Sequence, residues 1–211
     1  MLLLYITDRV QFSGDESARQ GALLAKIAEG TRCGLDLVQL REKDLTAREL
    51  EALARRVQHL IRENSGEPVT RWLINSRSDV AKAASADGVH LRSDDISPSE
   101  VRKIWAQAPY SARPLVSVSC HSAADVARAA SAAGDFAVFG PVFEKKDAAA
   151  ASPVGLDGLR EACRQKIPVL ALGGVTLANA HACLDSGAAG IAAIRLFQDN
   201  DIAEVVKRLR G

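Results

Sequence analysis

The sequence lacks paired cysteines, a marked excess of charge and any long run of apolar residues. Its four cysteines are scattered and none forms a Cys-x-x-Cys pair, so their spacing disfavours a zinc site or a disulfide framework. The formal net charge of +1 gives no reason to expect nucleic acid or an anionic membrane as a partner. The apolar N-terminal run stops at Thr7, which is too short for a membrane span. We therefore expect a cytoplasmic protein.

What the chain does contain is the composition of an ordinary globular protein. Hydrophobic residues make up 47% and charged residues 25% of its 211 positions. No low-complexity segment divides the chain, so we expect one domain over residues 1–211. The sequence leaves open whether copies of the chain form a homo-oligomer.

Eight short apolar runs recur along the chain, and most of them end in a polar or glycine-bearing cluster. Continuous Val, Ile and Leu runs are typical of parallel strands buried on both faces. With helical patterns between them, they predict an α/β fold, a single (β/α)₈ TIM barrel with its active site at the C-terminal strand ends. The expected strands are residues 2–7, 36–42, 72–76, 88–92, 115–121, 136–143, 169–174 and 190–195. The expected helices are residues 15–31, 46–64, 122–133, 176–186 and 199–210, with others near 79–86 and after 97.

Three polar side chains alternate along the second expected strand. Gln39, Arg41 and Lys43 share one face, which points into the lumen of a barrel. Two cations there are costly unless a ligand or a counter-charge meets them. A phosphate or pyrophosphate would do so, and an interior network of salt bridges is the structural alternative.

Oxygen-bearing side chains follow the third and fourth expected strands. Asn75 ends one, and Asp94 and Asp95 lie just beyond the other. The two adjacent acids can hold Mg²⁺, which takes oxygen ligands and commonly bridges to substrate phosphates. The same pair of acids is also common composition for a turn before a helix.

His121 ends the fifth expected strand and can act as a general acid or base. The alternative is a structural histidine whose ring nitrogens form hydrogen bonds within the protein. Its neighbour Cys120 is expected to be a small buried residue.

The last two expected strands indicate a phosphate subsite. Gly173 and Gly174 let the backbone approach a ligand closely, and Arg195 adds a positive charge. A tight turn would equally explain the two glycines. The segment 144–153, with Lys145 and Lys146, has the composition of a lid over the ligand or of a plain solvated loop.

Several segments together resemble the thiamine phosphate synthase family, and the match runs in order over nearly the whole chain. The segments are VQLREK at 38–43, INSRSDVA at 74–81, ADGVHL at 86–91 with the two acids after it, VSCHS at 118–122, FGPVF at 139–143 and ALGGV at 171–175.

The resemblance implies a transferase in thiamine biosynthesis. It joins an aminopyrimidine methyl diphosphate to a thiazole phosphate and releases pyrophosphate, with Mg²⁺ and cationic residues stabilising the departing diphosphate. By position, Gln39 contacts the pyrimidine, and Asp95 the metal. The diphosphate is contacted by Arg41, Lys43 and Asn75. The thiazole phosphate is held by Gly174 and the eighth strand.

The sequence departs from the family pattern at three places. Ser76 replaces an expected metal carboxylate, which predicts weaker Mg²⁺ binding. The usual Pro-Thr-x-Thr-Lys loop is replaced by the segment 144–147, where Lys145 or Lys146 can take over its contacts. Arg195 stands where a serine is common.

These departures keep two other functions open. The related thiazole tautomerases share the fold, and there His121 would transfer the proton on a thiazole phosphate carboxylate. A non-catalytic binder of thiazole phosphate is the third hypothesis. The retained residues of the second strand, together with Asp94 and Asp95, favour the synthase.

Overall fold

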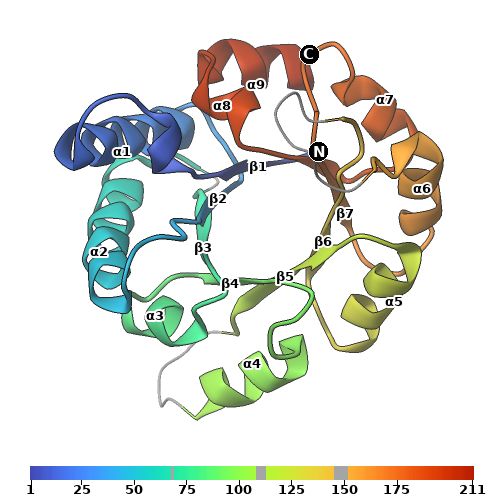
Figure 1. Ribbon diagram of the computed structural model, residues 1–211, viewed down its shortest axis with the longest axis horizontal. Coiled ribbons are helices and arrows are strands. Elements are labelled where there is room, and N and C mark those ends of the chain that lie inside the picture. Colours follow the sequence, from blue (N-terminus) through green and yellow to red (C-terminus); the bar gives the residue numbers. More distant parts are fainter. Residues whose placement is uncertain (68, 108–112, 145–151) are drawn as a thin grey trace.

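The computed structural model describes residues 1–67, 69–107, 113–144 and 152–211. Eight parallel strands form a closed barrel in the order β1 to β8, and β8 pairs with β1. Viewed along the barrel, the helices form a ring outside the strands (Figure 1). The predicted (β/α)₈ barrel is confirmed.

The strands are short and alternate with helices along the chain. The strands are β1 (Leu2–Ile6), β2 (Leu37–Leu40), β3 (Arg71–Asn75), β4 (Gly88–Leu91), β5 (Leu115–Cys120), β6 (Phe136–Phe139), β7 (Val169–Leu172) and β8 (Gly190–Ala193). The helices are η1 (Arg9–Gln11), α1 (Glu16–Arg32), α2 (Ala47–Asn64), α3 (Ser78–Ala83), α4 (Pro98–Ala106), α5 (Ala123–Ser131), α6 (Gly155–Ala162), α7 (Ala180–Asp185), α8 (Arg195–Gln198) and α9 (Ile202–Arg210). None of the helices in the described part of the chain is long and apolar enough to cross a membrane.

Several expected strands extended too far at their C-terminal ends. The second strand ends at Leu40 rather than at residue 42, and the sixth ends at Phe139, before Pro141. The eighth ends at Ala193, and Arg195 opens α8 instead of closing the strand. The polar and proline-bearing ends of these runs belong to the loops that form the mouth of the barrel.

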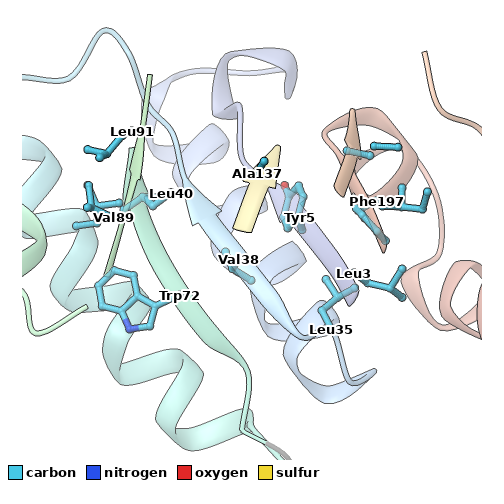
Figure 2. Close-up of a cluster of buried hydrophobic side chains, with 14 of the residues drawn as sticks. Leu3, Tyr5, Leu35, Val38, Leu40, Trp72, Val89, Leu91, Ala137 and Phe197 are labelled. Atoms are coloured by element: carbon cyan, nitrogen blue, oxygen red, sulfur yellow. The ribbon is translucent and has the colours of Figure 1, made fainter. Parts of the chain in front are cut away.

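Side chains alternate between the two faces of the barrel wall, so the strands contribute to two cores. An inner cluster fills the lumen and includes Leu4, Leu37, Leu73 and Phe136. The larger outer cluster lies between the strands and the helices. Figure 2 shows part of the outer cluster.

The outer cluster is sealed between β1 and α8 by an aromatic pair. The rings of Tyr5 and Phe197 meet edge to face with centroids 6.2 Å apart. The buried Tyr5 hydroxyl donates to Gln198 Oε1 at 2.9 Å. The apolar faces of strands and helices thus hold the ring closed, which brings all eight strand ends to one mouth.

Candidate active site

A layer of polar side chains lies inside the barrel, at the C-terminal end of the apolar lumen. Gln39, Asn75, His90 and Ser117 each stand two residues beyond an inward-facing position on their strands. Gln39 Nε2 donates to Asn75 Oδ1 at 3.0 Å, and His90 Nδ1 lies 2.8 Å from Ser117 Oγ. The lumen is therefore apolar below and polar where it opens.

Gln39 carries a buried acceptor that has no partner in the described structure. Its side chain is 1% exposed, and its Oε1 atom makes no hydrogen bond. A buried acceptor without a donor is costly, so this atom indicates a ligand with an N–H or O–H group. Asn75, which accepts from the other end of the same amide, fixes its orientation.

His90 is neutral at the pH of a cell. Burial lowers its pKa to about 4, and the positive charge of Arg41 acts in the same direction. The 5% exposure of His90 makes it part of the buried interior.

Arg41 and Lys43 lie beyond the last residue of β2, at the mouth. Arg41 is half-buried, and its effect on His90 places its charge near the polar layer. Among the described residues no carboxylate forms an ion pair with Arg41. Lys43 is exposed and lies in the turn after the strand, so the period-two pattern does not extend to it.

An ion network that the sequence did not reveal surrounds the buried Arg9. The Arg9 guanidinium contacts Glu16, Glu42 and Asp44 at 2.8, 3.2 and 2.7 Å. Hydrogen bonds to Asp44 raise the pKa of Arg9, and the same bonds lower the pKa of Asp44. Burial raises the pKa of Glu42, while hydrogen bonds from Thr7 and Arg9 oppose the rise. The acids that follow Arg41 and Lys43 in the sequence, Glu42 and Asp44, thus pair with Arg9.

The expected metal corner at β3 and β4 is held by protein contacts. Asp95 Oδ2 accepts from the Arg92 backbone N–H at 2.8 Å, and the Arg92 guanidinium lies 3.2 Å from Asp94 and 3.4 Å from Asp95. Ser76 supplies a hydroxyl that accepts from Asn75 Nδ2 at 3.2 Å. Within the described residues no group of three or more His, Cys, Asp or Glu side chains could hold a metal ion.

His121 lies at the mouth, next to the end of β6. Its Nδ1 is 2.6 Å from the carbonyl oxygen of Gly140, which can only accept, so Nδ1 carries a proton and donates it. Its backbone N–H donates to Asp125 at 2.9 Å. Cys120 is fully buried, and burial raises the pKa of its thiol to about 12.

Gly173 and Gly174 form the turn after β7, and both have positive φ angles, 94° and 64°. A Cβ on Gly174 would lie 2.5 Å from the Glu144 carbonyl oxygen, so packing alone already requires glycine there. Arg195 is exposed, and its Nε lies 3.4 Å from Gln11 Oε1. The predicted contacts of Lys145 and Lys146 lie outside the described residues.

Comparison with known proteins agrees with this geometry. The model of a family described as thiamine monophosphate synthase matches residues 5–197. The chain belongs to the thiamine monophosphate synthase family. A provisionally named thiamine-phosphate synthase of Geobacter sulfurreducens is 41% identical over 98% of this chain and 92% of its own length. A thiamine-phosphate synthase of a Roseiflexus species is 35% identical over 92% of this chain and 76% of its own length.

Solved structures show the same barrel. The thiamine phosphate pyrophosphorylase of Pyrococcus furiosus superposes with a TM-score of 0.80 at 28% identity, covering 99% of this chain and 93% of that one. A 3-hexulose-6-phosphate synthase, at 18% identity and a TM-score of 0.69, shares the fold alone.

Proposed function

We propose that this protein is a transferase that joins an aminopyrimidine methyl diphosphate to a thiazole phosphate and releases pyrophosphate. The observation that carries the proposal is made at the mouth: among the described residues, the buried Gln39 Oε1 has no hydrogen-bond donor and Arg41 forms no ion pair with a carboxylate. Membership of the thiamine monophosphate synthase family and the names of the relatives support it.

The bond changes assign a clear task to the protein. The C–O bond between the pyrimidine methylene and the diphosphate breaks, and its electron pair leaves on the diphosphate oxygen. The thiazole nitrogen then donates its lone pair to the methylene carbon and forms the new C–N bond. Because charge accumulates on the leaving group, Arg41 and Lys43 act by stabilising the departing diphosphate.

The polar layer selects and orients the pyrimidine. Gln39 Oε1 accepts a hydrogen bond from the exocyclic amino group, while Asn75 holds the rest of the amide in place. The inner apolar cluster below Gln39 provides an apolar surface for the flat pyrimidine ring. The turn at Gly173 and Gly174, with Arg195, holds the thiazole phosphate above it.

Mg²⁺ remains a prediction for this chain. The corner offers Asp95, 15% exposed in its side chain, but Arg92 already neutralises it, and Ser76 brings no second charge. The residues therefore do not fit a magnesium site built by the protein alone, since Mg²⁺ prefers several oxygen ligands in octahedral geometry.

Pyrophosphate release from both substrates, supplied with saturating Mg²⁺, tests the proposal. We expect release by the purified protein, and a loss of about 10²-fold in Arg41→Gln because a charge on the leaving group is left unmet. Arg55→Gln, which removes an exposed arginine of α2, is the matched control and should keep full activity. No release at all would contradict the proposal.

The same preparations separate the alternatives. Tautomer exchange on a thiazole phosphate carboxylate that is lost in His121→Ala would identify a tautomerase. A rise in melting temperature with thiazole phosphate, without either reaction, would identify a binder.

A further inference from the structure

The chain after β2 alternates cations with acids, and the acids have one common partner. Arg41 and Lys43 are followed by Glu42 and Asp44 respectively, and both acids bind the guanidinium of Arg9. Asp44 is bound through both oxygens, at 2.7 and 2.8 Å. A paired arginine and carboxylate in this forked geometry is strongly directional.

Arg9 can hold these acids because it is itself enclosed. Its side chain is 3% exposed, and that of Glu42 is 1% exposed. Glu42 Oε2 also accepts from the Arg9 backbone N–H at 3.0 Å. A buried pair with this many hydrogen bonds has few alternative arrangements, so Glu42 stays with Arg9, and the forked contact holds the more exposed Asp44 beside them.

Thr7 connects the network to Arg41. Its hydroxyl donates to Glu42 Oε1 at 2.5 Å and accepts from the Arg41 backbone N–H at 2.9 Å. Thr7 is fully buried, so water does not replace either bond. The backbone from which Arg41 reaches the mouth is therefore fixed by the hydroxyl that also holds Glu42.

We infer that Thr7 and Arg9 are positioning residues for the diphosphate subsite. They keep Glu42 and Asp44 from neutralising Arg41, and they fix the strand end that carries it. This inference rests on the proposed function, because it assumes that Arg41 meets the diphosphate.

Calorimetric titration with inorganic pyrophosphate tests the inference without catalysis. Thr7→Val keeps the shape but removes the hydroxyl, and should weaken pyrophosphate binding about tenfold, the effect of one lost hydrogen bond. Thr7→Ser restores the hydroxyl and should bind as the original protein does. In kinetics, Thr7→Val should raise the KM for the diphosphate substrate and leave the KM for thiazole phosphate unchanged.

A second variant tests the positioning role if Thr7→Val is too unstable to assay. Asp44 is 56% exposed in its side chain, so Asp44→Asn should fold, but its amide nitrogen cannot accept the second Arg9 N–H. The loss of a negative charge would by itself tighten pyrophosphate binding, whereas a positioning role predicts binding weaker by about two- to fivefold. Tighter or equal binding in Asp44→Asn, or equal binding in Thr7→Val, overturns the inference. A starting protein that binds no pyrophosphate would overturn the proposed function instead.

Discussion

Folding favours the neutral form of the His90 imidazole. The unfolded chain takes up that proton near the ordinary pKa of 6.5, whereas the folded protein resists it until about pH 4. The unfolded state thus binds more protons in this range, so stability rises with pH and is lost as the pH falls from about 6.5 towards 4.

The size of this effect can be measured with a variant that does not titrate. Between pH 7 and pH 4.5 the His90 contribution should fall by about 2 to 3 kcal/mol, from about 1.4 kcal/mol per unit of pKa shift. His90→Asn keeps a polar atom near Nδ1 for Ser117 and should lose correspondingly less stability over that range. Urea unfolding at both pH values checks this, and an equal loss in the two proteins would contradict it.

Ser76 combines an unusual backbone conformation with a missing charge. Its φ angle is +60°, in the left-handed region that Asn and Asp tolerate better than serine does. Ser76→Asp should therefore fit the backbone and add a carboxylate on the strand end next to that of Asp95. We expect Mn²⁺, used in place of Mg²⁺, to bind about tenfold more tightly, as each added charged ligand strengthens such sites.

Ser76→Asn is the matched control, because it shares the backbone preference without the charge. Its Mn²⁺ affinity, followed by electron paramagnetic resonance, should equal that of the starting protein. Arg92→Ala, which removes the guanidinium charge beside Asp95, should act in the same direction as Ser76→Asp. Unchanged affinity in both Ser76→Asp and Arg92→Ala would show that this corner does not attract metal ions.

At the scale of the element, the N-terminal cap of α9 can be tested by substitution. Asp201 Oδ1 accepts from the Glu204 backbone N–H at 2.9 Å, which satisfies one N–H of the first turn. Asp201→Ala should lower the free energy of unfolding by about 1 kcal/mol. Asp201→Asn keeps the cap but loses the charge near the helix N-terminus, so it should cost only a few tenths of a kcal/mol, about the lower end of dipole effects. Equal costs by denaturant unfolding would show that the hydrogen bond contributes nothing.

Strands were more predictable than the loops that join them to helices. The run Phe136–Phe139 is buried on both faces, so hydrophobicity alone locates it. Arg195 followed an apolar run just as closely, yet it begins a helix, because β8 and its pairing with β1 end two residues earlier. A pattern of apolar residues records burial, and burial continues past the point where strand pairing stops.

The geometry of the candidate site was predictable where it depends on strand alternation and not where it depends on partners on other elements. Gln39 and Asn75 come together because neighbouring strands share a register. The partners of Arg9 lie on α1 and beyond β2, at separations that no local pattern encodes. Arg92 likewise reaches Asp95 only through the turn between them, so the two acids looked available for a metal.

At the scale of the whole molecule, ligand binding should be visible as stability. Pyrophosphate that binds only the folded barrel adds about 2.7 kcal/mol at a concentration of 100 times its Kd. For a chain of this size that corresponds to a rise in Tm of roughly 5 to 10 °C. A thermal melt with and without pyrophosphate measures it, and inorganic sulfate at equal ionic strength is the control. A rise of the same size with sulfate would indicate nonspecific anion binding.

The apolar cluster that fills the lumen closes the barrel at one end and leaves it open at the mouth. Whatever reaches Gln39 has to enter and leave past the same rim, because Leu4, Leu37 and Phe136 occupy the other end. If the proposed aminopyrimidine binds at Gln39, it must arrive before the thiazole phosphate, because the second substrate then covers it until the two are joined. The order of substrate binding would then follow from the apolar packing of the lumen, which takes no part in the proposed reaction.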